Sequence, residues 1–363
     1  MYAERLARAR RRMERLDVDV LLLSVGADLP WLTGYRAMPL ERLTMLVVPV
    51  AGEATLVVPR LEAPRVVEHP DVFTVEAWEE TDDPIALVAG LASDAGVVAV
   101  GDRTWAGFLI QLQARLPAAR WQAAGPVTGP LRAVKDAAEV ASLRAASAAA
   151  DRVAAQLQAG DIRLVGRSEA DVSADLGRRL LAEGHAGVNF SIVAAGPNAA
   201  SPHHDAGPRI IESGEVVLCD FGGTMPDGYC SDITRCVYTG EPPPAFRDLY
   251  RVLEEAQAAA VAAAVVGTPC EDVDGVARRI ITDGGYGPDF LHRTGHGIGL
   301  DEHEDPYLVG GNCEELLPGH AFSVEPGIYL EGRFGARIED IVVATAAGPE
   351  PLNRVGHGLA VVD

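Results

Sequence analysis

Residues 215–239 read EVVLCDFGGTMPDGYCSDITRCVYT, and this stretch sets the architecture of the second half of the chain. Two apolar runs flank a proline, aspartate and glycine turn at residues 226–228, which is the pattern of a β-hairpin. Asp220 and Asp232 lie six residues before and six residues after Pro226, so we expect a cross-strand pair with its carboxylates about 5 Å apart. Because like charges this close repel, a bound cation is the simplest explanation.

A second acid-bearing hairpin is predicted over residues 322–344, FSVEPGIYLEGRFGARIEDIVVA. Glu325 and Glu339 lie seven residues before and after Gly332, and so form a second candidate pair. Exposed acids on a solvated strand would explain either pair alone. Two pairs flanked by glycine, valine and isoleucine, in place of lysine and arginine, favour a cation-binding arrangement.

Histidines gather between the two hairpins, in the segment HRTGHGIGLDEHEDP at residues 292–306. His292, His296 and His303 are interleaved there with glycines, which allow the backbone to approach a ligand or metal closely. The spacing of the first two also fits a helical zinc pair, but the glycine-rich context argues against a helix. We therefore assign one histidine to metal and the others to substrate.

Four carboxylates and one imidazole form an oxygen-rich ligand set that suits paired divalent ions such as Mn, Co, Fe or Zn. Two ions about 3.5–4 Å apart can hold a hydroxide between them and polarise a carbonyl, which is the chemistry of two-metal hydrolases. The chain has neither a G-x-S-x-G nucleophile elbow nor a G-x-x-x-x-G-K-[ST] phosphate loop. The sequence therefore predicts metal-dependent hydrolysis.

Composition narrows the class of protein further. The chain has 363 residues, a hydrophobic fraction of 48% and a formal charge of −21, so we expect two globular domains and no nucleic acid or membrane partner. We expect a soluble cytoplasmic protein, since the Arg-rich start lacks a signal-peptide pattern. The five cysteines contain no C-x-x-C pair, and we expect them to be buried and reduced.

Periodicity divides the chain near residue 133. Residues 1–132 alternate helical and strand-like segments, which predicts an α/β domain, and they contain no metal-ligand or nucleophile spacing. The second domain, residues 133–363, is expected to open with an alanine-rich helix over about 136–158.

Three further helices are predicted in the second domain. One is opened by Ser168 as the N-cap, and one covers about 244–265. The last begins with Thr268 as the N-cap, followed by a proline at the first helical position. The remaining segments, including both hairpins, have the pattern of antiparallel strands.

The motifs DFGGTMPDGYCSDITR, GHGIGLDEHEDP, SVEPGIY and ARIED, in this order and with these spacings, resemble those of the proline-specific metallopeptidases of the pita-bread fold. This family includes Xaa-Pro dipeptidase (prolidase) and aminopeptidase P, with methionine aminopeptidase and creatinase as relatives. The resemblance implies a creatinase-like α/β domain at 1–132 and an α+β pita-bread catalytic domain at 133–363. Asp220 and Asp232 are 12 positions apart where 11 is usual, which suggests a one-residue insertion in TMPDG.

The resemblance also implies a division of labour among the ligands. Asp220 would chelate one metal ion, and His296 and Glu325 the other, while Asp232 and Glu339 would bridge both. Glu325 would also act as the general base.

Other side chains would complete the site. His203, His292 and His303 match the substrate-site histidines of the family, although His204 directly follows His203 and either could face the site. Arg337 and Tyr229 would support the ligands from behind, and for Tyr229 simple packing is an equally open alternative.

The function implied is hydrolysis of the Xaa-Pro bond of dipeptides or short peptides by a hydroxide bridging two metal ions, with Mn, Co or Zn as candidates. The alternative is an aminopeptidase P that accepts longer peptides, and a non-catalytic binding module is more distant. A dipeptidase needs a cationic side chain that binds the free carboxylate of the dipeptide, and Arg36 and Arg42 are candidates. The alternative is that both are ordinary exposed loop arginines. In the family the first domain caps the site, often across a dimer, so we expect a homodimer.

Overall fold

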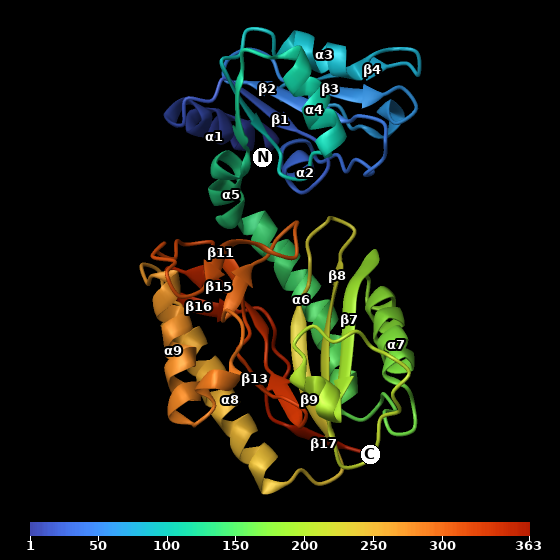
Figure 1. Cartoon of the computed structure of the whole chain (residues 1–363), viewed down its shortest axis with the longest axis vertical. Coiled ribbons are helices and arrows are strands. Elements are labelled where there is room, and N and C mark those ends of the chain that lie inside the picture. Colours follow the sequence, from blue (N-terminus) through green and yellow to red (C-terminus); the bar gives the residue numbers. More distant parts are fainter. The chain divides into compact units, whose positions relative to one another are not determined.

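The computed structural model describes all of residues 1–363, which form two compact units, Met1–Arg132 and Ala133–Asp363 (Figure 1). No helix combines the length and the apolar composition that a membrane crossing requires. The α/β class predicted for the first domain and the α+β class predicted for the second are both confirmed.

The first unit is built on a six-stranded mixed sheet. Its strands, in their order across the sheet, are β4 (Thr74–Trp78), β3 (Thr55–Pro59), β2 (Met45–Pro49), β1 (Val20–Leu23), β5 (Val97–Val100) and β6 (Arg120–Ala123). Its helices are α1 (Tyr2–Arg15), α2 (Asp28–Thr33), α3 (Pro84–Leu91), α4 (Ala106–Arg115), α5 (Gly125–Ala133) and the short η1 (Ala63–Arg65).

The apolar pattern of the sequence explains the central strand and the first helix of this unit. β1 is four consecutive buried residues, VLLL, as expected of a strand covered on both faces. Along α1, Leu6, Ala9 and Met13 are buried, and their spacing of three and four residues gives one apolar face.

The second unit contains two sheets and a separate hairpin. One sheet is formed by β17 (Ala360–Val362), β9 (Ile233–Thr239), β8 (Val216–Thr224) and β7 (Gly187–Ala195). The other is formed by β11 (Glu304–Leu308), β10 (Gly295–Gly297), β12 (Ala321–Val324), β15 (Asp340–Thr345) and β16 (Gly348–Pro351). The hairpin is β13 (Gly327–Leu330) with β14 (Phe334–Arg337).

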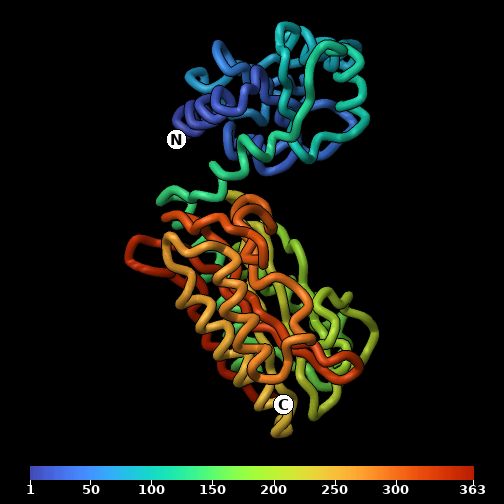
Figure 2. The backbone as a smooth tube through the Cα atoms, turned by 60° about the vertical axis from the view of Figure 1, so that its left-hand side comes forward, coloured from blue at the N-terminus to red at the C-terminus, as the bar shows by residue number.

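Four long helices cover these sheets: α6 (Ala137–Gln158), α7 (Glu169–Ala182), α8 (Pro244–Ala263) and α9 (Cys270–Asp283). The unit also has two short 3-10 helices, η2 (Gly196–Ala200) after β7 and η3 (Gly287–Asp289) after α9. α6 and α7 lie together on one side of Figure 1, and α8 and α9 on the other. Figure 2 shows α8 and α9 side by side as neighbouring coils.

Strand alternation decides which face of β8 each side chain occupies. Val217 and Cys219 pack in the core cluster that includes α6 and α7, whereas Val216 and Leu218 pack in the cluster that includes α8 and α9. Because side chains alternate along a strand, Asp220 points away from α6 and α7. This parity directs the carboxylate toward the interior between the two sheets.

Helix starts were predicted with one error. Asp136 caps α6 in a capping box, and Ser168 caps α7 by accepting from the Asp171 amide. Thr268 is not the N-cap of α9, as expected from sequence, because the helix begins at Cys270 and Pro269 occupies the cap position without a side-chain hydrogen bond.

The first hairpin differs from the prediction by one position. Asp220 pairs with Thr234 and Phe221 with Ile233, so the hairpin is centred on Asp227 and not on Pro226. Asp220 and Asp232 are therefore diagonal neighbours on one face and not a directly opposed pair. The five-residue turn accounts for the shift, since its geometry is not fixed by the positions of its acids.

The second hairpin has the predicted register. Gly327 pairs with Arg337 in β13–β14, and Val324 pairs with Asp340 in β12–β15. Both pairs are centred on Gly332, which adopts a φ of +70° at the tip, a conformation that glycine tolerates best.

A buried arginine joins the two sheets near these acids. The Arg235 guanidinium donates to Asp340 Oδ1 at 2.7 Å and to the Glu339 carbonyl at 2.6 Å. It also donates to the carbonyls of Val355 and Gly356 at 3.0 and 3.1 Å. Both side chains of the Arg235–Asp340 pair are at most 1% exposed.

Replacement of Arg235 by methionine is expected to lower the free energy of unfolding by about 3–5 kcal/mol, because it removes the permanent cation from buried Asp340 and leaves only His357 and Gln257 as side-chain partners. Urea unfolding measures this change. The matched control is R251M, since Arg251 forms only a surface pair with Glu255 and its loss should cost below about 1 kcal/mol. Equal midpoints for the two variants would contradict a structural role for the buried pair.

Candidate metal centre

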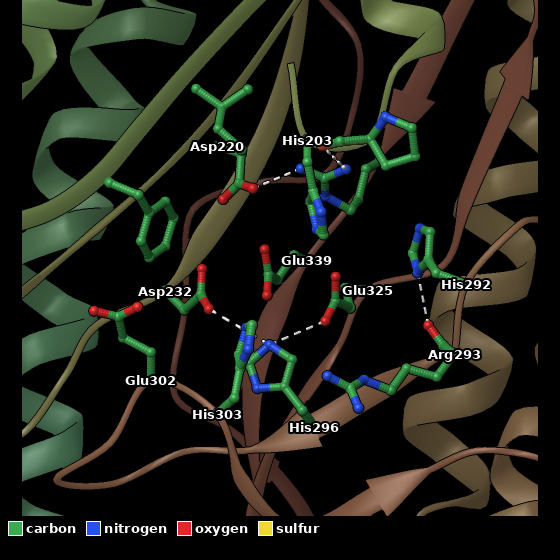
Figure 3. A pocket seen from close by; sticks show the side chains of 14 residues that line it. His203, Asp220, Asp232, His292, Arg293, His296, Glu302, His303, Glu325 and Glu339 are labelled. Carbon is green, nitrogen blue, oxygen red and sulfur yellow. Dashed lines mark hydrogen bonds and ion pairs between the residues drawn. The ribbon is translucent and has the colours of Figure 1, made fainter. Parts of the chain in front are cut away.

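The second unit contains a cavity of about 490 Å³ at the place where its strands meet. All of the ligands and substrate histidines predicted from sequence line this cavity, as does Arg337. Figure 3 shows the carboxylates and imidazoles pointing into one common space.

Two of the candidate ligands lie within strands, and the other three lie at the start of a strand or in a gap between strands. Asp220 is in β8, and Asp232 directly precedes β9. His296 is the central residue of β10, so the predicted absence of a helix there is confirmed. Glu325 and Glu339 occupy the gaps between β12 and β13 and between β14 and β15.

At these gaps the two strands of the second hairpin are not paired with each other. The Glu325 amide donates to the Thr294 carbonyl at 2.8 Å, and the Glu339 amide donates to the Thr234 carbonyl at 3.3 Å. The two glutamates are thereby attached to strands from both sheets. This exchange of partners brings the acids of the two hairpins together.

Three of the ligands form a tight group. Candidate ligand atoms of Asp232, His296 and Glu339 lie within 4.8 Å of one another, and all three residues are buried. His296 Nε2 is 3.1 Å from Glu325 Oε1 and 3.7 Å from Asp232 Oδ2. Its Nδ1 lies 3.1 Å from the Gly297 carbonyl, so Nε2 is the nitrogen that faces the acids.

Arg337 holds the remaining acid from behind. Its guanidinium donates to Asp220 Oδ2 at 2.5 Å and to Thr234 Oγ1 at 3.0 Å. Thr234 in turn donates to Glu339 Oε2 at 2.7 Å. A single buried cation therefore orients two carboxylates, one directly and one through a hydroxyl group.

Burial dominates the acid–base behaviour of the group. It raises the pKa of Asp232 and Glu339 well above the ordinary range, and the charges of neighbouring acids add to the rise. Burial also acts to raise the pKa of Glu325, but the hydrogen bond and charge of His296 outweigh it and lower this pKa to about 2. The protein alone thus fails to stabilise all of these carboxylates in the ionised form.

The arrangement fits a pair of divalent cations. Asp220 Oδ1 is buried and has no hydrogen-bond partner, although its other oxygen is bound by Arg337. Four carboxylates facing one guanidinium carry an excess of negative charge, and hard carboxylate oxygens with one imidazole are the donors that such cations prefer. Asp220, Asp232, His296, Glu325 and Glu339 are therefore the candidate ligands.

The structure separates the two adjacent histidines. His203 lines the cavity, whereas His204 Nε2 lies 2.8 Å from Glu169 Oε2. Glu169 is fully buried and also accepts from the Ala195 amide at 2.8 Å and from Asn198. His204 thus fixes the segment that presents His203.

The other two histidines contact different partners. His292 Nδ1 lies 2.7 Å from the Arg293 carbonyl, and its Nε2 lies 2.8 Å from the Tyr329 hydroxyl. That hydroxyl accepts from Arg337 at 2.8 Å, so it can donate to His292. The His303 ring lies 4.0 Å from the His296 ring, measured between centroids.

Tyr229 does not line the cavity. It donates to Glu139 Oε1 at 2.8 Å and packs with Leu143 and Ile298. These contacts agree with the packing alternative, and a role in supporting the ligands from behind stays a prediction.

Several polar residues of the site were missed from sequence. Tyr329 follows Glu325 by four positions within SVEPGIY, and this proximity to a ligand was the available signal. Thr234 gave no signal, because a threonine in a strand is ordinary. Arg293 and Glu302 line the cavity from within the histidine segment, where the histidines drew attention away from them.

The arginines considered for a carboxylate clamp belong to the first unit. Arg42 donates to Glu41 and Glu80 at 2.6 and 2.7 Å, so its guanidinium is already engaged. Arg36 is exposed. Of the five cysteines, four are buried as expected, and Cys313 is exposed.

Comparison with known proteins identifies the family. Residues 141–346 match metallopeptidase family M24, and residues 5–134 match the creatinase/prolidase N-terminal domain. The chain is 43% identical to the probable dipeptidase PepE of Mycobacterium tuberculosis, over 100% of this chain and 97% of that protein.

Solved structures agree with this match. The dipeptidase PepE from Mycobacterium ulcerans is 44% identical with a TM-score of 0.93, covering 99% of this chain and 97% of that one. A prolidase from Thermococcus sibiricus is 33% identical with a TM-score of 0.94, covering 100% and 99%. An X-Pro aminopeptidase from Thermotoga maritima is 30% identical with a TM-score of 0.82, covering 97% and 100%. With its two matched domains and its buried cluster of acids and histidine, the chain belongs to the metallopeptidases of family M24.

Proposed function

We propose that the chain is an Xaa-Pro dipeptidase that works with two divalent metal ions held by Asp220, Asp232, His296, Glu325 and Glu339. The observation that carries this proposal is the set of four carboxylates around one imidazole, three of them buried, with a single guanidinium paired to any of them. Similarity to a dipeptidase and to a prolidase supports the choice of substrate class. The donor set suits Mn, Co or Zn.

Metal ions bound there would polarise the scissile carbonyl and lower the pKa of the attacking water. Glu325 is the proposed general base, since its carboxylate faces the cavity beside His296, 3.1 Å from Nε2, where the attacking water would lie. Ser323 donates to Glu325 Oε1 at 2.9 Å and so limits its rotation. The same carboxyl group can then deliver the proton to the proline nitrogen, which has no hydrogen of its own in the peptide and must gain one to leave.

His203, His292 and His303 are proposed to contact the substrate and the negative charge that develops on its carbonyl oxygen. The chain of hydrogen bonds from Arg337 through Tyr329 to His292 gives His292 a fixed orientation. Both ring nitrogens of His292 are engaged, Nδ1 by the Arg293 carbonyl and Nε2 by the Tyr329 hydroxyl, so His292 would contact the substrate through its ring, and His203 and His303 would donate to the oxyanion.

An aminopeptidase P is the second candidate, because the X-Pro aminopeptidase from Thermotoga maritima shares the fold over nearly the full length. The two activities differ in whether peptides longer than two residues are accepted. We further propose a homodimer in the cytoplasm, on the basis of the family resemblance, which sedimentation of the purified protein and fractionation of cells would test.

Replacement of Asp232 by asparagine should remove most of the bound metal and lower kcat/KM by at least about 10³-fold, since a ligand carboxylate is lost. Elemental analysis and hydrolysis of Ala-Pro measure both effects. D227N is the matched control, because Asp227 lies exposed in the same hairpin turn and undergoes the same chemical change. Unchanged metal content in D232N would refute the ligand assignment.

Assays with Ala-Pro, Ala-Pro-Ala and a longer Xaa-Pro peptide should show a kcat/KM at least about tenfold higher for the dipeptide, because only the dipeptide ends in a free carboxylate next to proline. Initial rates at several substrate concentrations give this ratio. Faster cleavage of the longer peptides would replace the dipeptidase proposal by the aminopeptidase one.

The variant H203A is expected to lower kcat by about 10²-fold, as loss of a donor to a developing oxyanion does, while the metal content stays the same. H204A should keep kcat within about threefold, because His204 contacts Glu169 outside the cavity and contributes mainly to stability. Steady-state kinetics with thermal unfolding separates the two effects. Similar losses of kcat in both variants would argue against direct substrate contact by His203.

A further inference from the structure

Glu302 is the one acid of the cavity lining that is not a candidate metal ligand. It belongs to the segment between β10 and β11, directly before His303. Its side chain is partly exposed and forms no hydrogen bond or ion pair with another residue. A carboxylate without a protein partner at the edge of a substrate cavity is available for a group on the substrate.

The surroundings of Glu302 combine charge with apolar surface. Phe190 and Ile192, alternate residues of β7, line the same cavity, and the Phe190 ring lies against Gly222, where an added Cβ would come within 2.7 Å of it. Gly222 occupies the β8 position level with Asp232. Figure 3 shows Glu302 beside Asp232, so an apolar wall and an acid meet on one side of the ligand cluster.

A positively charged side chain lies on the opposite side of the cavity. His292 and Arg293 lie across the candidate ligands from Glu302 in Figure 3. The Arg293 guanidinium lies 4.3 Å from the centre of the Tyr307 ring, a cation–π contact that leaves its charge uncompensated by any carboxylate. The cavity is therefore acidic at one end and basic at the other, which orients a peptide with a positive end toward Glu302.

The α-ammonium group of a substrate has other carboxylates available to it. In any peptide this nitrogen is within about 2.5 Å of the carbonyl carbon under attack, so it remains next to the ligand carboxylates. Glu302 is not one of these ligands, which leaves it available for a long side chain of the first residue. Lysine and arginine combine an aliphatic stem with a cationic head, which matches the apolar wall and the acid in that order.

Resting on the proposed Xaa-Pro activity, we propose that Glu302 selects the N-terminal residue of the substrate and favours lysine or arginine. The aliphatic stem would pack against Phe190 and Ile192, and the cationic head would pair with Glu302. Because this carboxylate is partly exposed, the expected preference over an uncharged side chain of equal length is about threefold to tenfold.

The test compares kcat/KM for Lys-Pro, Arg-Pro and norleucine-Pro in the metal-loaded wild type, E302Q and D301N. E302Q should lower the ratio of Lys-Pro to norleucine-Pro by about threefold to tenfold and leave norleucine-Pro unchanged. D301N removes the same charge from the preceding residue, which does not line the cavity, and should keep the wild-type ratio. E302K should invert the preference toward Glu-Pro.

Two results would overturn the proposal: a Lys-Pro ratio that is the same in E302Q and the wild type, or an equal loss for every substrate, which would assign Glu302 to the α-ammonium group or to structure. If the wild type cleaves no Xaa-Pro peptide, the proposed function fails separately. Calorimetric binding of Lys-Pro and norleucine-Pro to E325Q and to E325Q with E302Q then decides the role of Glu302. Equal affinity for Lys-Pro in both would reject it.

Discussion

Repulsion among four carboxylates in one cavity is the constraint around which the second unit is organised. Asp220, Asp232, Glu325 and Glu339 converge there, and Arg337 is the one permanent cation that pairs with any of them. Such a cluster is destabilising unless cations offset it. The interrupted strands, the hydroxyl of Thr234 and the arginine behind Asp220 all serve to hold these acids together against their own charge, in the arrangement that metal ions require.

The fold could be predicted to the extent that it depends on local pattern. Strand alternation, the Asp136 and Ser168 caps and the centre of the second hairpin at Gly332 each follow from a few neighbouring residues. The first hairpin was displaced by one position because its TMPDG turn admits more than one geometry. Thr268 failed as a cap because the amides of Cys270 and Glu271 donate to the carbonyls of Glu314 and Asn312, so a segment far along the chain fixes where α9 begins.

The residues of the candidate site could be found from sequence because charged side chains in an apolar setting are conspicuous. The residues that hydrogen-bond to these side chains could not be found in the same way. Thr234 and Tyr329 are ordinary strand residues until β9 and the β13–β14 hairpin come together, and the contact of Tyr229 with Glu139, ninety residues earlier, has no sequence signal. His203 and His204 are equivalent in sequence, and only the buried Glu169, more than thirty residues earlier, distinguishes them.

The parallel pairing of β17 with β9 has a consequence for biosynthesis. β9 leads directly from Asp232, yet its neighbour in the sheet, residues 360–362, is translated only after every candidate ligand has been made. Since unpaired strand edges are prone to aggregate, the nascent chain exposes the β9 edge throughout synthesis of α8, α9 and the second sheet. The sheet that carries Asp220 is therefore completed on its β9 side only when residues 360–362 pair with it.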